Sequence, residues 1–218
     1  MSAGFWLAGR RVDDGEFAEV RHPGSGELIA HYVVPGPEHV GLAAAAAAEA
    51  AAECRALSAA DRAAALDHVV VQLGRRFDEV AELITAENGK PAIWARAEVT
   101  RAQSTFRWAA EEARRFGGEV QRLDTDPAMS GRAAIIRRFS IGPVLGIAPF
   151  NFPLNLVAHK VAPAIAVGSP VVVKPSPRTP LSALLLGEIL SETDLPAGAV
   201  SVWPVGVELT RALVDDPR

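Results

Sequence analysis

Two polar side chains, Asn151 and Lys174, stand directly behind apolar segments in the second half of the chain. Asn151 lies in "GIAPFNFP", where Pro149 and Pro153 restrict the backbone on both sides. A rigidly held amide can donate a hydrogen bond to a developing oxyanion. The alternative is that Asn151 only caps a helix beginning at Leu154, and the spacing favours neither interpretation. Lys174, in "VVVKP", suits a ribose or a phosphate, although a lysine at a strand end is, taken alone, more often only solvated.

The elements that would position these side chains alternate between strand and helix. Strands are expected at 143–150, 170–175 and 199–205, and helices at 154–167, after an N-cap at Thr179 and from 208 onward. This alternation is typical of a parallel sheet, and three such strands make half of a doubly wound nucleotide-binding fold. Because ligands bind at the carboxyl ends of these strands, Asn151 and Lys174 are expected at the same edge. Neither a G-x-G-x-x-G sequence nor a P-loop is present.

The first 141 residues are expected to form a scaffold. Residues 5–34 alternate in polarity between turn signals, which predicts a small antiparallel meander. A helix is expected from Pro37, a second from the N-cap Ser58 with Asp61 to a stop at Gly89, and a third over 92–116. Residues 119–141 alternate and carry arginines, which indicates an exposed ribbon that either needs edge protection or pairs with another chain.

Composition narrows the function classes. The chain has 218 residues, 49% of them hydrophobic, and a net charge of -4, which argues against nucleic acid as a partner. Cys54 is the single cysteine and is expected to be a small buried residue, not a nucleophile. The five histidines have no metal-ligand spacing, so no metal is expected. Neither a signal peptide nor a membrane-spanning segment is found, and a soluble cytoplasmic protein is the expectation.

The segment "GPVLGIAPFNFPLNLVAHKVAPAIAVGSPVVVKPSPRTP" resembles the aldehyde dehydrogenase superfamily, in which a Pro-Trp/Phe-Asn-Phe-Pro motif precedes a Lys-Pro-Ser-Glu-like motif. The segments "VRHPGSGELIA" and "ENGKP" are also similar to its N-terminal region. The resemblance implies an α/β fold: half of a Rossmann-like parallel sheet with an N-terminal β-meander and long helices. Residues 1–218 would form one incomplete N-terminal cofactor-binding domain, and 119–141 its protruding oligomerisation ribbon.

The resemblance also implies roles for single residues. Asn151 would be the amide that holds the oxyanion, and Lys160 a proton relay, with a structural ion pair as an equal alternative. The residues implied in binding NAD or NADP are Ile147, Ala148, Pro149, Phe150, Asn151, Lys174, Ser176, Pro177 and Gly206. NAD-preferring relatives have a Glu at the position of Pro177, and Arg178 follows it here. NADP is therefore expected to be accepted at least as well as NAD.

The chain departs from the family in lacking the nucleophilic Cys of Gly-Gln-x-Cys and the base Glu of Glu-Leu-Gly-Gly, and it ends before a Phe-Thr-Gly-Ser turn. It is therefore expected to be an N-terminal fragment of an NAD(P)-dependent aldehyde dehydrogenase, inactive alone. Substrates such as lactaldehyde, phosphonoacetaldehyde or glyceraldehyde 3-phosphate are expected. Its partners would be further copies or a complementing C-terminal half, and association is expected at an open sheet edge near Val202. The alternative is a non-catalytic remnant that acts as a nucleotide-binding or interaction module.

Overall fold

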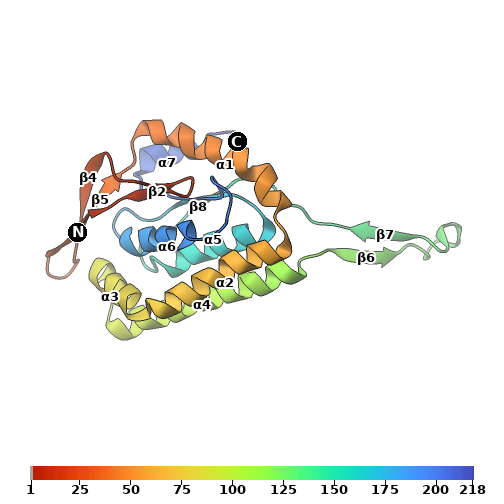
Figure 1. The fold of residues 1–218 in the computed structure, drawn as a ribbon, viewed down its shortest axis with the longest axis horizontal. Helices are drawn as coiled ribbons and strands as arrows, with labels where there is room; N and C mark the ends of the chain where they lie inside the picture. The colour runs from red at the N-terminus through yellow and green to blue at the C-terminus, as the bar shows by residue number, and fades with distance from the viewer. Residues whose placement is uncertain (1) are drawn as a thin grey trace.

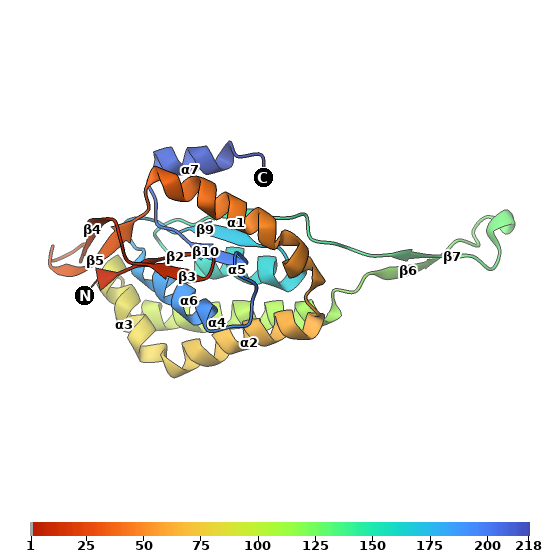
Figure 2. The same ribbon diagram turned by 45° about the horizontal axis from the view of Figure 1, so that its top comes forward.

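The structure, a computed structural model, describes residues 2–218 and is built in layers (Figures 1 and 2). Helices α1 and α7 cover one face of a central sheet, and α5 and α6 cover the other. Helices α2, α3 and α4 pack on the outside of α5 and α6. The helices are α1 (Pro37–Ala56), α2 (Ala59–Arg75), α3 (Phe77–Asn88), α4 (Ala92–Arg115), α5 (Asn155–Val167), α6 (Leu181–Ser191) and α7 (Val207–Val214), with a short 3₁₀ turn, η1 (Pro127–Met129).

The central sheet has the strand order β3-β2-β10-β9-β8. Its bounds are β2 (Phe5–Leu7), β3 (Arg10–Val12), β8 (Val144–Ile147), β9 (Val171–Lys174) and β10 (Val200–Val202). Strands β8, β9 and β10 are parallel, which confirms the predicted half of a Rossmann-like sheet. The expected open edge near Val202 is wrong, because Val202 pairs with Trp6 of the antiparallel strand β2. Within residues 2–218, the parallel strand with an unpaired edge is β8, which pairs only with β9.

The N-terminal strands divide between two sheets, so the predicted single meander is only partly right. Strands β1 (Ser2–Ala3), β5 (Leu28–Val34) and β4 (Glu16–Arg21) form one sheet, in which β1 runs parallel to β5. The β2–β3 hairpin instead extends the central sheet. It is anchored there because the indole of Trp6 donates to the carbonyl of Leu184 on α6 (2.9 Å) and packs over Gly187, where a Cβ would lie 2.4 Å from the ring.

The single helix expected between Ser58 and Gly89 is two helices, α2 and α3, which meet at Arg76. The backbone leaves helical geometry there (φ -100°, ψ 21°), and the guanidinium pairs with Glu79 and with Glu188 on α6. The predicted ends are confirmed. Ser58 and Asp61 form a capping box, and Gly89 ends α3 in the left-handed conformation.

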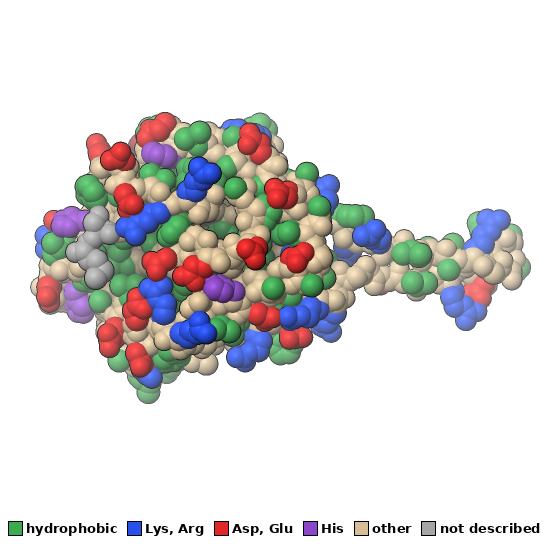
Figure 3. Space-filling view, in the orientation of Figure 1, with side chains coloured by type: hydrophobic (Ala, Val, Ile, Leu, Met, Phe, Trp, Pro, Cys, Tyr) green, Lys and Arg blue, Asp and Glu red, His purple; other side chains and the backbone are tan. Residues whose placement is uncertain are grey.

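A two-stranded ribbon of β6 (Glu119–Arg122) and β7 (Ala133–Ile136) projects away from the layered body, as the sequence predicts (Figure 1). Gly118 opens it with φ +116°, where a Cβ would lie 2.0 Å from the carbonyl oxygen of Ile136, so only glycine fits. The ribbon exposes hydrophobic side chains along its length, among them Val120 and Ile135 at 73% and 76%. Figure 3 shows these green side chains between blue arginines at the base and the tip.

The described residues contain no helix that is both long and apolar enough to cross a membrane. They also contain no group of three or more His, Cys, Asp or Glu side chains that could hold a metal ion.

Candidate functional site

The carboxyl ends of β8 and β9 form the candidate site. Ile147 is paired with Lys174, and the amide of Ala148 continues the ladder to the carbonyl of Lys174 (3.0 Å). Asn151 therefore follows the end of one strand while Lys174 ends its neighbour, at the same edge of the sheet as expected. Gly206 opens α7 after the third parallel strand, β10. The predicted cofactor residues thus all lie in or directly after parallel strands.

The exposure of these residues suits a flat ligand with a charged part. Ile147 and Phe150 are 47% and 50% exposed, which is high for large hydrophobic side chains. Pro149, Asn151 and Gly206 are exposed, Lys174 and Pro177 are half-buried, and Ala148 and Ser176 are buried. Ser176 has an internal role, because its hydroxyl accepts from the amide of Arg178 and shapes the turn after β9 (3.2 Å).

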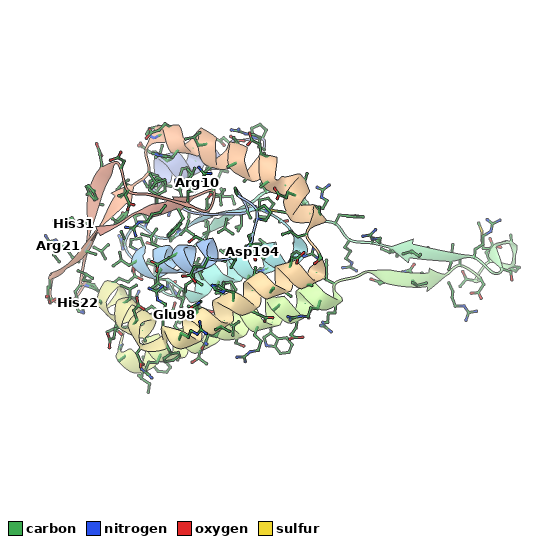
Figure 4. The ribbon with its side chains drawn as sticks, in the orientation of Figure 1. Arg10, Arg21, His22, His31, Glu98 and Asp194 are labelled. Carbon is green, nitrogen blue, oxygen red and sulfur yellow. The ribbon has the colours of Figure 1, made fainter. Side chains whose placement is uncertain are left out.

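Asn151 does not cap helix α5, which removes one of the two interpretations of this residue. The amides of Leu154 and Asn155 both donate to Oε1 of Glu98, at 2.9 and 3.0 Å. Glu98 projects from α4 and its side chain is fully buried (Figure 4). Within residues 2–218 the side-chain amide of Asn151 makes no hydrogen bond, so it is free to bind a ligand.

Helix α6 is capped in the same way, so the predicted N-cap at Thr179 is wrong. The amides of Leu181 and Ser182 donate to the buried carboxylate of Glu87, at 2.6 and 3.0 Å. The Thr179 hydroxyl donates instead to the carbonyl of Phe150 (3.4 Å). A carboxylate supplied from α3 takes this place because negative charge is stabilised at a helix N-terminus.

These two caps bear on how a dinucleotide can bind. A Rossmann helix usually offers its N-terminal amides to the pyrophosphate. Here the N-termini of α5 and α6 already hold the carboxylates of Glu98 and Glu87. The missing glycine-rich fingerprint agrees with this arrangement, because two amides at each helix N-terminus are already bound to a carboxylate.

Burial raises the pKa of Glu87 to about 7, and the nearby charge of Glu98 adds to the effect. The hydrogen bonds from Ser182 and Leu181 act in the opposite direction but are outweighed. Glu87 is therefore a buried carboxyl group that titrates near neutral pH, and its ionisation is coupled to folding.

Lys174 and Arg178 supply positive charge at this edge. Desolvation lowers the pKa of the half-buried Lys174, which forms no ion pair within the described part of the chain. The Arg178 guanidinium lies 5.7 Å from the centre of the Phe150 ring. The turn between Lys174 and Arg178 is held by β5, because the Tyr32 hydroxyl donates a hydrogen bond to the carbonyl of Pro177 (3.3 Å). With no carboxylate in residues 174–178, the turn suits a phosphate group.

Lys160 lies on α5, with its aliphatic stem packed against β8. A Cβ at Gly146 would come within 2.8 Å of the Lys160 Cβ, so glycine allows this close approach. No carboxylate in residues 2–218 pairs with Lys160, so the structural ion pair weighed from the sequence does not form within this chain. The proton-relay role stays a prediction.

Cys54 is buried on α1, as predicted. Burial, and to a lesser degree the charge of Glu53, raises the pKa of its thiol to about 11. It is therefore protonated at neutral pH and cannot act as an activated nucleophile. Away from the site, a cavity of about 500 Å³ lies between β2, α3 and α6; none of the predicted site residues lines it.

Sequence reasoning missed Glu87 and Glu98. Glu98 is flanked on α4 by Ala95, Val99 and Ala102, all completely buried, so a charged residue interrupts an apolar stripe. That interruption is the signal that could have revealed a buried cap, because an acidic residue is almost never fully buried without partners.

Known proteins resemble this chain over nearly its whole length. Residues 10–218 match the Aldehyde dehydrogenase family. The mitochondrial succinate-semialdehyde dehydrogenase of Oryza sativa subsp. japonica is 36% identical over 198 residues, which are 90% of this chain and 37% of that protein. Aldehyde dehydrogenase 21 of Physcomitrella patens, solved with the reaction product succinate, superposes with a TM-score of 0.94 at 44% identity, covering 99% of this chain and 45% of that one.

A third protein, the NADP-dependent glyceraldehyde-3-phosphate dehydrogenase of Bacillus halodurans solved with NADP, gives a TM-score of 0.92 at 31% identity, covering 100% of this chain and 46% of that one. The chain therefore spans less than half the length of these relatives. Solved proteins of this fold hold NADP or NAD.

Proposed function

Because this chain belongs to the aldehyde dehydrogenase family, we propose that it forms the cofactor-binding and oxyanion-holding part of an enzyme that oxidises an aldehyde to a carboxylic acid. The observation that carries the proposal is the free side-chain amide of Asn151 after the carboxyl end of β8, at the same sheet edge as the half-buried Lys174 that ends β9. An amide in this place stabilises the negative charge that forms on the aldehyde oxygen when a nucleophile adds to the carbonyl carbon.

The residues present fit a nicotinamide dinucleotide. Exposed Ile147 and Phe150 offer apolar surface for a ring, and Lys174 with Ser176 would bind the adenosine ribose. When bound, the nicotinamide accepts the hydride that leaves the substrate carbon. NADP is expected to bind at least as well as NAD, because Lys174 and Arg178 flank a turn that contains no carboxylate.

The nucleophile and the general base are proposed to come from polypeptide outside residues 1–218. Cys54 is the only cysteine of the chain, and its buried thiol stays protonated at neutral pH. A non-catalytic nucleotide-binding module is the alternative function, and the protonated Cys54 thiol is compatible with both. The two are distinguished by whether a supplied catalytic segment restores turnover.

The substrate is proposed to be a small aldehyde with an anionic group. The names of the relatives support this class, since they refer to succinate semialdehyde, glutarate semialdehyde and 3-sulfolactaldehyde. Lactaldehyde, phosphonoacetaldehyde and glyceraldehyde 3-phosphate remain candidates, and two of these three are also anionic. Propanal, which has no charge, is the matched comparison.

The ribbon is proposed to pair with a second copy of the chain or with the complementing half. Its exposed Val120 and Ile135 sit directly opposite each other in the β6–β7 ladder and form an unpartnered apolar surface. Pairing at such an edge would satisfy backbone groups and cover apolar area at once.

The test measures NAD(P)H formation by the purified chain, alone and mixed with a polypeptide that carries the family's catalytic Cys and Glu. We expect no turnover by the chain alone, turnover in the mixture, and a roughly 10²–10³-fold lower kcat with Asn151→Ala. Turnover by the chain alone that disappears with Cys54→Ala would refute the assignment of Cys54. Dinucleotide binding without any restored turnover would favour the non-catalytic module.

A further inference from the structure

We propose that Lys90 is a positioning residue that holds the backbone of Asn151 and so sets the direction of its side-chain amide. Lys90 lies in the short loop between α3 and α4, far from Asn151 in sequence. This inference rests on the proposed function, in which Asn151 binds the oxyanion, and it concerns what keeps Asn151 in place.

The Lys90 ammonium makes three contacts, all directed at the loop after β8 or at its support. It donates to the backbone carbonyl of Asn151 (2.8 Å) and to Oε2 of Glu98 (2.6 Å), and it lies 4.5 Å from the centre of the Phe152 ring. Its side chain is 12% exposed and that of Glu98 is 0% exposed. Two donors of the ammonium are therefore bound to acceptors, and the Phe152 ring covers the charge from a further side.

Glu98 joins this contact to the start of α5. One carboxylate oxygen pairs with Lys90, while the other accepts from the amides of Leu154 and Asn155. Asn88, on the opposite side of Gly89 from Lys90, donates to the carbonyl of Phe150 (2.8 Å). Consecutive peptide groups on both sides of Asn151 are therefore held by the segment 88–98.

The side chain of Asn151 is left out of this network. Its carbonyl is bound, but its amide group forms no hydrogen bond in the described residues and is exposed. Backbone restraint with a free donor is what an oxyanion site needs, because a pre-oriented donor requires no rearrangement when charge develops. A cap that only stabilised α5 would need Glu98 but would not need the bond from Lys90 to Asn151.

The presence of a lysine and not an arginine at position 90 is a second observation that supports a positioning role. The chain contains 22 Lys and Arg residues, of which only Lys90, Lys160 and Lys174 are lysine. Lys174 ends the strand beside β8, and Lys160 packs against Gly146 of β8 itself. Arginine and lysine are not interchangeable, since a compact ammonium can be enclosed where a planar guanidinium cannot. All three lysines of the chain thus contact or border β8 and the loop that follows it.

The experiment uses the full 218-residue chain, labelled with ¹⁵N, and measures the backbone order parameter of residues 150–155 by NMR. In the wild type we expect values near 0.85, as in rigid backbone, and in Lys90→Met a fall toward about 0.6 at Asn151 and Phe152. Leu154 and Asn155 should change less, because Glu98 still accepts their amides. Lys90→Gln, which keeps a donor for Glu98, serves as the second variant if Lys90→Met does not fold.

Arg62→Met is the matched control. Arg62 also donates from a cationic side chain to a backbone carbonyl, that of Leu57 (2.7 Å), but between α1 and α2. It should leave residues 150–155 unchanged even if it lowers the melting temperature. Unchanged order at Asn151 in both Lys90 variants would overturn the proposal.

A kinetic arm separates this inference from the function on which it rests. In the mixture with the catalytic polypeptide, Lys90→Met should lower kcat by roughly 10- to 100-fold with little change in the KM for NADP, as expected for a small misplacement of a catalytic group. If Asn151→Ala keeps the full kcat, the proposed function fails, while the NMR result still decides the positioning. If Asn151→Ala loses kcat and Lys90→Met does not, only the positioning role is wrong.

Discussion

The loop after β8 and the β6–β7 ribbon differ in what holds them. The loop at 150–155 is held by the buried charged side chains of Lys90, between α3 and α4, and Glu98 on α4, which are more than fifty residues away in the sequence. The ribbon is held by its own ladder, between strands joined by residues 123–132, and by the exposed Glu119–Arg138 ion pair, and its large apolar side chains face solvent. The geometry of the loop therefore depends on the whole fold. The geometry of the ribbon depends on residues close to it in sequence, and its apolar surface has no partner within the described chain.

The largest contrast should appear when one carboxylate is removed from each region. We expect Glu98→Ala to lower the free energy of unfolding by about 3–5 kcal/mol, because it leaves the Lys90 ammonium buried without a counter-ion and two amides without an acceptor. Glu119→Ala removes the exposed ion pair with Arg138 on the ribbon and should cost less than about 1 kcal/mol. Urea denaturation of both variants measures this, and similar costs would contradict the contrast.

The second buried carboxylate cap, that of Glu87 at the start of α6, should also respond to pH in a way that the ribbon does not. The folded-state pKa of Glu87, at about 7, lies above the 4.5 of an ordinary Glu. The folded chain therefore binds more protons than the unfolded chain between these values. The contribution of Glu87 to the free energy of unfolding is fully present below pH 4.5 and is lost as the pH rises through about 7.

We expect the free energy of unfolding to fall by on the order of 1 kcal/mol per pH unit across that window. Glu87→Gln should remove this slope, while Glu119→Gln on the ribbon should leave it unchanged. Stability measured by urea denaturation at several pH values provides the check. A slope that survives Glu87→Gln would mean that another group titrates there.

A charge added at the sheet edge should change cofactor choice, and the same charge on the ribbon should not. Pro177→Glu places a carboxylate in the turn after β9, where it would repel the 2′-phosphate of NADP. The ratio of the NADP and NAD dissociation constants should move toward NAD by about tenfold, or about 1.4 kcal/mol. Ala128→Glu in the η1 turn is the control with equal charge. A wild-type chain that already prefers NAD tenfold would refute the expected use of NADP.

The smallest effect on stability should come from the ribbon surface. Val120→Glu combined with Ile135→Lys replaces an exposed cross-strand pair by two opposite charges, and should change the free energy of unfolding by no more than about 0.5 kcal/mol. The same double variant should shift the chain toward monomer in analytical ultracentrifugation, because it removes the apolar surface. Association that is unaffected would place the contact elsewhere, for example at the open edge of β8.

Local patterns in the sequence were sufficient wherever the deciding contacts are close in the chain. The capping box of Ser58 and Asp61 and the left-handed stop at Gly89 depend on a few neighbouring residues. The ribbon was also predictable, because alternation and turn signals determine a hairpin locally. The placement of Asn151 and Lys174 at the same sheet edge followed from a general rule, since the carboxyl ends of neighbouring parallel strands meet at one edge.

Contacts between distant segments were not predictable in this way. The break between α2 and α3 lies where Arg76 meets Glu188 of α6, and the β2–β3 hairpin joins the central sheet because Trp6 reaches Leu184 of the same helix. In each case a helical or strand pattern continued through the sequence, and a partner more than a hundred residues away decided the geometry. Secondary-structure propensities cannot predict such contacts, because they sum only local preferences.

From the amino-acid sequence alone, a parallel Rossmann-like sheet with an amide and a lysine at one edge could be predicted, and the motifs resembled one enzyme family. The fold then showed that Asn151 is free, since Glu98 from α4 caps α5 in its place. It also showed that Glu87 and not Thr179 caps α6. A buried carboxylate is tolerated only where folding brings it enough donors, and those donors come from helices whose positions in space local sequence patterns do not specify.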